Sequence, residues 1–151
     1  LYEQIYYLKG NIISILTAVF VGCIVGIVSV VGIAKLMGTD TQMLFSLAPK
    51  SVTTPIAISI AKNNHGIPEL AVVFVIICGI FGGAVGPIVL RYLNIKSKVA
   101  KGLAMGTASH ALGTVSAIEM GATEGAISGL AIGIMGIMTA MVMPFIEKIL
   151  N

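Results

Sequence analysis

The chain has 151 residues and a formal net charge of +3, and 57% of its residues are hydrophobic while only 10% are charged. Water-soluble domains contain about 25% charged residues, so this composition excludes a protein surrounded by water. The basic residues do not cluster on a soluble face, which excludes a nucleic-acid-binding domain.

The first predicted element is a transmembrane helix over residues 12–34, "IISILTAVFVGCIVGIVSVVGIA", which contains no charged residue. A helix needs roughly 20 apolar residues to cross the hydrocarbon core of a bilayer. Two later stretches, 70–90 and 125–146, meet the same requirement. The sequence therefore predicts an all-α, polytopic transmembrane helix bundle. The two cysteines, Cys23 and Cys78, lie inside these apolar stretches and are interpreted as small packed thiols.

The second element, residues 44–62, reads "LFSLAPKSVTTPIAISIAK" and is interrupted in its middle. Pro49 removes a backbone donor and disfavours helix at the residue before it. Thr53 and Thr54 precede Pro55, which is the order of a capping hydroxyl followed by proline at the first helical position. We therefore expect non-helical backbone within 48–54 and a half-helix over 55–61 that begins inside the membrane.

The connector after the second span, residues 91–101, carries four basic residues and no acidic one. Short loops rich in Lys and Arg face the cytoplasm. The pattern places residues 91–101 on the cytoplasmic side, and contact with phospholipid headgroups is a secondary interpretation.

The fourth element, residues 102–119, reads "GLAMGTASHALGTVSAIE" and contains a second polar interruption. Gly106 and Gly113 flank Thr107, Ser109 and His110, so a break is expected between the two glycines, although no proline enforces it. The last element is the span 125–146.

The acidic residues Glu119 and Glu124 flank the short stretch "MGAT" at a membrane boundary, where solvated helix caps are expected.

Glycine pairs four residues apart occur on all three spans and allow close helix approach. They are Gly22 and Gly26, Gly79 and Gly83, and Gly129 and Gly133. A tight bundle or the face of a homo-oligomer would use them.

Broken backbone at membrane depth costs several kcal/mol for each unpaired polar group, so it occurs where it is packed in protein or lines a cavity. Transporters use such breaks to bind ions and substrates. The two interruptions therefore predict a site for a small carboxylate or a proton, with no cofactor and no metal. The candidate substrate-binding residues are Lys50, Ser51, Thr53, Thr54, Pro55, Thr107, Ser109, His110 and Thr114.

Two of these residues have a second interpretation. Lys50 is either a cation facing the cavity or a side chain that extends to the headgroup layer. His110 is either a ligand and carrier of a co-transported proton, since histidine titrates near neutral pH, or a packed histidine bonded to a neighbouring helix.

The two interrupted segments suggest an internal repeat. A shift of 57 residues aligns Ser116 with Ser59, Gly136 with Gly79, Ile137 with Ile80 and Pro144 with Pro87. The predicted units are residues 44–90 and 102–146, each with a broken segment followed by a span. Whether the units are parallel or inverted depends on whether each broken segment crosses the membrane or returns.

The stretches "PKSVTTPIA" and "GTASHALGT" closely resemble signature motifs of the LrgB/CidB family of bacterial membrane proteins. The resemblance covers nearly the whole chain and implies one LrgB-like domain over 1–151 in the bacterial inner membrane, without the additional N-terminal spans that family members carry. It also implies a small membrane partner of the LrgA or CidA type. The family is described as antiholin-like, modulating murein hydrolases and autolysis, and its plastid relative resembles a glycolate/glycerate translocator; bacterial members are linked to pyruvate.

Three functions follow from these observations. The first is a transporter or channel component for a small carboxylate; the second is an antiholin-like regulator of autolysis; the third is a structural membrane protein. The polar breaks favour the first over the third, because a scaffold gains nothing from unpaired backbone. No nucleophile elbow, phosphate-binding loop, zinc motif or paired carboxylates appear, so we expect no enzymatic activity.

Overall fold

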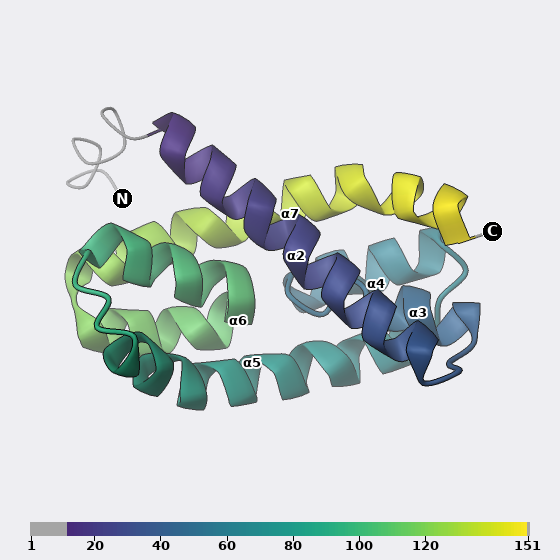
Figure 1. Cartoon of the computed structure of the whole chain (residues 1–151), viewed down its shortest axis with the longest axis horizontal. Helices are drawn as coiled ribbons and strands as arrows, with labels where there is room; N and C mark the ends of the chain where they lie inside the picture. The colour runs from purple at the N-terminus through teal and green to yellow at the C-terminus, as the bar shows by residue number, and fades with distance from the viewer. Residues whose placement is uncertain (1–11, 151) are drawn as a thin grey trace.

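The computed structural model describes residues 12–150, and within that range all regular structure is helical. The helices are α2 (Ile12–Leu36), α3 (Thr41–Leu47), α4 (Thr54–Asn63), α5 (Pro68–Tyr92), α6 (Lys98–Met120) and α7 (Ala122–Leu150) (Figure 1). The three predicted spans correspond to α2, α5 and α7, each long and apolar enough to cross a membrane. The expected all-α fold is confirmed.

The surfaces of the long helices are apolar rather than polar. Ile13, Phe81 and Ile137 are 78%, 67% and 64% exposed. Exposed side chains of this kind are compatible with lipid and not with water over so large a surface. The chain is therefore a membrane protein.

The first interrupted segment, α3 to α4, forms a hairpin that returns to the end at which it began. Residues 48–53 are non-helical, as expected. The backbone N–H of Ile67, just beyond α4, donates a 2.7 Å hydrogen bond to the hydroxyl of Ser46 in α3. Gly66 packs so closely on Phe45 that an added Cβ would lie 2.9 Å from its carbonyl carbon. We call residues 41–63 the first hairpin.

The second interrupted segment, α6, is a second hairpin. His110 has φ 42° and ψ −130°, which ends one helical arm, 98–109, and starts another, 111–120. Gly113 lies against the backbone carbonyl of Met105, a contact that a straight helix does not allow. The predicted break between Gly106 and Gly113 is confirmed. We call residues 98–120 the second hairpin.

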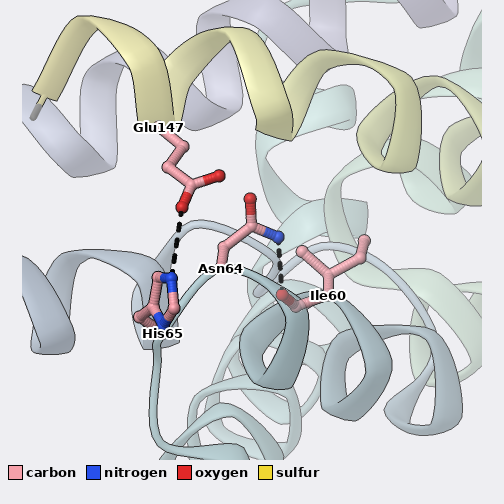
Figure 2. A network of polar contacts seen from close by, with 4 residues as sticks. All are labelled: Ile60, Asn64, His65 and Glu147. Carbon is pink, nitrogen blue, oxygen red and sulfur yellow. Dashed lines mark hydrogen bonds and ion pairs between the residues drawn. The ribbon is translucent and has the colours of Figure 1, made fainter.

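The two hairpins enter the bundle from opposite ends. In Figure 1, α5 and α7 run along opposite sides, with α3 and α4 near one end, α6 near the other, and α2 crossing them. The imidazole of His65, just after the first hairpin, lies 3.8 Å from the carboxylate of Glu147 near the end of α7. Figure 2 shows this pair beside the amide of Asn64, which donates a 2.7 Å hydrogen bond to the carbonyl of Ile60. The end of α7 thus lies at the open end of the first hairpin.

Equivalent helix boundaries recur at the 57-residue spacing seen in the sequence. The N-cap residues Asp40 and Ser97 occupy matching positions, and each side chain accepts a hydrogen bond from a backbone N–H three residues on. The second arms begin at residues 54 and 111, which also match. Because each hairpin returns and the helix between them crosses, the two units have inverted orientation.

Candidate functional site

The tips of the two hairpins are joined through the middle of α5. The ammonium of Lys50, in the first tip, donates a 2.9 Å hydrogen bond to the hydroxyl of Ser51 and lies 4.0 Å from the sulfur of Cys78. The thiol of Cys78 in turn donates to the carbonyl of Ala108 in the second tip, at 3.4 Å. We call Lys50, Cys78 and Ala108 the contact chain.

The second tip is held by His110. Its ring is only 4% exposed, and Nε2 lies 2.8 Å from the carbonyl oxygen of Val75 on α5. A carbonyl only accepts, so Nε2 carries the hydrogen and donates it. The sequence allowed two interpretations of His110. This geometry agrees with the second, a packed histidine bonded to a neighbouring helix. A positive φ in a non-glycine residue costs about 1–3 kcal/mol and is concentrated at functional sites.

Glycines on α5 make this approach possible. A Cβ at Gly79 would lie 2.6 Å from Cε1 of His110, and a Cβ at Gly82 would overlap the hydroxyl of Ser109. Close packing at Gly79 and Gly83 was predicted from their spacing, and both lie against the second hairpin.

The other glycine pairs behave differently. Gly22 has only an ordinary contact with Thr107, and Gly26, Gly129 and Gly133 have nothing within 4 Å of an added Cβ among the described residues. Close approach at those positions does not occur within the described fold.

Several predicted hydroxyls are engaged within the protein. Thr107 donates to the carbonyl of Leu103 at 2.7 Å. Thr114 donates to the carbonyl of His110 at 3.1 Å and shares a 2.7 Å hydrogen bond with the hydroxyl of Ser128. These side chains fasten the second hairpin to itself and to α7.

The start of α4 lacks the capping hydroxyl that was expected at Thr53. Thr53 is the N-cap residue with extended backbone, but its side chain makes no capping hydrogen bond. The predicted capping hydroxyl is therefore wrong for Thr53. Thr54 is the first helical residue and Pro55 the second. Proline suits this place because the first N–H groups of a helix lack intrahelical partners.

Pro55 and Ser109, two of the nine predicted residues, line different cavities. Pro55 lines a cavity of about 340 Å³ with Pro144 of α7. Ser109 lines a separate groove of about 250 Å³ between α5 and α6. Lys50 is the predicted residue of the first tip that reaches toward the second, through Cys78, and Ser51 accepts a hydrogen bond from it.

Sequence reasoning missed two features. Cys78 was interpreted only as a packed thiol, and nothing in its apolar surroundings signals that it lies between the tips. Glu124 was expected to be solvated, yet it is 4% exposed, beside the closely approaching Gly121. Glu119, its predicted counterpart, is exposed.

The tips also carry oriented backbone charge. The arm over 111–120 and helix α4 both start at a tip, so two helix N-termini point toward the middle of the bundle. Each N-terminus carries roughly half a positive charge. The amino group of Lys50 is a further donor in the first tip, and such an arrangement favours an anion.

Comparison with known proteins gives a family. The model of the LrgB-like family matches residues 1–149. The chain is 38% identical to YxaC of Bacillus subtilis (strain 168) over 146 residues, which is 97% of this chain and 64% of that protein. It is 40% identical to the antiholin-like protein LrgB of Bacillus mycoides (strain KBAB4) over 144 residues, 95% of this chain and 63% of that protein. No solved structure matches. The chain thus spans less than two thirds of the length of these relatives.

Proposed function

The chain belongs to the LrgB-like family, and from that premise we propose that it is a transporter or channel component for a small carboxylate of the pyruvate or glycolate type. The observation that carries the proposal is the contact chain, which joins the tips of two hairpins inserted from opposite ends of the bundle. Inverted repeats with broken helices meeting near the membrane midplane are a recurrent construction of secondary transporters.

The chemistry of the tips supports an anionic substrate. A carboxylate entering between them would meet the ammonium of Lys50 and the N–H groups at the start of α4. Thr53 and Thr54 are half-buried there. In surroundings of low dielectric constant, removal of one hydrogen-bond donor from a buried anion costs about 1–3 kcal/mol. Thr107, Ser109, His110 and Thr114 would position the second tip.

The proposed orientation places the connector 91–101 in the cytoplasm of a bacterial cell. Arg91, Lys96, Lys98 and Lys101 lie there with no acidic residue, as the positive-inside rule requires. A small LrgA- or CidA-type membrane protein is the proposed partner.

Uptake of radiolabelled pyruvate, glycolate and lactate into proteoliposomes, with and without the small partner, tests the proposal. Lys50→Gln and Thr54→Val should lower uptake roughly tenfold to a hundredfold while insertion is unchanged. Lys62→Gln, at the far end of α4, is the matched control and should transport like the parent. Unaltered uptake in both Lys50→Gln and Thr54→Val would refute the assignment.

A second candidate function is regulation of autolysis, because several relatives carry the name antiholin-like protein LrgB. The two functions are separated by the same variants. If Lys50→Gln abolishes uptake and autolysis together, substrate movement underlies the phenotype; if autolysis responds in cells while purified parent protein moves no carboxylate, regulation is the function.

A further inference from the structure

We propose that the end of the bundle that carries the connector 91–101 holds an anionic phospholipid, with its phosphate among basic side chains and one acyl chain between α5 and α6. This inference does not depend on the transport proposal.

The headgroup part of the site is a cavity of about 350 Å³. Arg91, Lys96 and Lys101 line it together with the amide-bearing Asn94. Among the described residues the one ion pair within 4.0 Å joins His65 to Glu147, so none of the three cations is directly paired with a carboxylate. A concave site with three basic groups attracts a phosphate, and Arg can bind it through two parallel hydrogen bonds.

The connector that presents these cations is ordered by its own backbone. Asn94 has φ 54°, a left-handed conformation that asparagine tolerates. The N–H of Asn94 bonds the carbonyl of Arg91, and the N–H of Ile95 bonds the carbonyl of Leu90, each at 3.0 Å. The hydroxyl of Ser97 caps α6 by accepting from the N–H of Ala100 at 3.3 Å. The cations are thus held on a defined turn.

The acyl-chain part is an adjoining groove of about 250 Å³ with no charged residue. Leu90 lines both the cavity and the groove, so the two are neighbours. Gly82 and Gly86 on α5 line the groove together with Ala104 and Ala108 on the first arm of α6. From Leu90 to Gly82 an α-helix rises about 12 Å, the scale of a substantial part of an acyl chain.

The basic cavity and the apolar groove together indicate which kind of molecule occupies the site. A soluble phosphate would use the cations but leave the apolar groove empty, and a helix of a partner would fill the groove without needing the cations. An anionic phospholipid satisfies both, because basic pockets between transmembrane helices suit its headgroup and burial of each CH₂ is favourable by about 0.8 kcal/mol.

The test uses the purified full-length protein, native mass spectrometry and thermal unfolding in detergent, with phosphatidylglycerol, phosphatidylcholine of the same chain length, and glycerol 3-phosphate. Phosphatidylglycerol should remain bound and raise the unfolding temperature more than phosphatidylcholine does. Arg91→Gln, Lys96→Gln and Lys101→Gln combined should weaken phosphatidylglycerol binding roughly a hundredfold. The control removes three cations from the other end, by Lys35→Gln, Lys62→Gln and Lys148→Gln, and should retain the preference.

Two further variants test the groove. Ala108→Leu places a larger side chain in it from an exposed position and should weaken binding of both lipids, whereas Ala111→Leu, exposed on the second arm and outside the groove lining, should not. Equal binding of the two lipids, equal losses in both triple variants, or unaltered binding in Ala108→Leu would overturn the proposal. Binding of glycerol 3-phosphate as tightly as the lipid would identify a soluble phosphate as the ligand instead and would also overturn it.

Discussion

Met105 and Gly113 are in contact because the chain reverses at His110. A continuous α-helix would hold these two residues about 12 Å apart along its axis. Their contact converts a segment of membrane-spanning length into a hairpin, and the hairpin brings the second tip to the contact chain.

The backbone conformation of His110 predicts that glycine at this position is more stable than alanine, the reverse of the usual order in a helix. At a regular helical position alanine is more stable than glycine by about 1 kcal/mol. With φ 42° the order should reverse at residue 110, so His110→Gly should unfold at a higher temperature than His110→Ala by thermal unfolding in detergent. Both variants lose the bond to Val75, which makes them a matched pair.

The control for this order is Val115, exposed on the regular second arm. There Val115→Ala should be more stable than Val115→Gly. If alanine is also the better residue at 110, the sharp reversal of α6 is wrong.

The glycine contacts on α5 predict a position-specific cost for one methyl group. Gly82→Ala should destabilise the protein by about 1–3 kcal/mol, because the added Cβ overlaps the hydroxyl of Ser109. Gly133→Ala has open space and should be neutral or slightly stabilising. Chemical or thermal unfolding of both variants in the same detergent makes the comparison, and equal stability would show that the second tip does not rest on α5.

The contact between Lys50 and Cys78 predicts a cross-link. In a background with Cys23→Ala, the variant Lys50→Cys should be joined to the native Cys78 by a short bifunctional thiol reagent. Intact mass should then show one linker attached at both ends. Lys62→Cys is the control, and each of its two cysteines should acquire its own linker, attached at one end only. If Lys50→Cys also acquires two such linkers, the first tip lies away from α5.

The inverted hairpins predict that their open ends lie on opposite sides of the membrane. In cells, a membrane-impermeant thiol reagent should label Asn63→Cys and not Ser97→Cys, both of which are exposed in the structure. Inverted membrane vesicles should give the reverse result. Labelling of both positions from one side would contradict the inversion, and labelling of Ser97→Cys alone in intact cells would reverse the proposed orientation.

The sequence by itself determined the features that depend on local composition. The three spans follow from hydropathy, the break over residues 48–53 follows from Pro49 and Pro55, and the interruption around His110 follows from its glycines and hydroxyls. The proline at the start of α4 could be placed because its missing N–H is tolerated there whatever the surroundings.

Tertiary structure alone decided that each broken segment returns, that the two units are inverted, and that Lys50 lies beside Cys78. A break in a helix is compatible with crossing or returning, and in the second segment the return depends on the backbone conformation at His110 and on the space left by Gly79 and Gly82. The packing of the second tip on these glycines is a contact between residues distant in the chain, and the periodicity of a single segment carries no information about it.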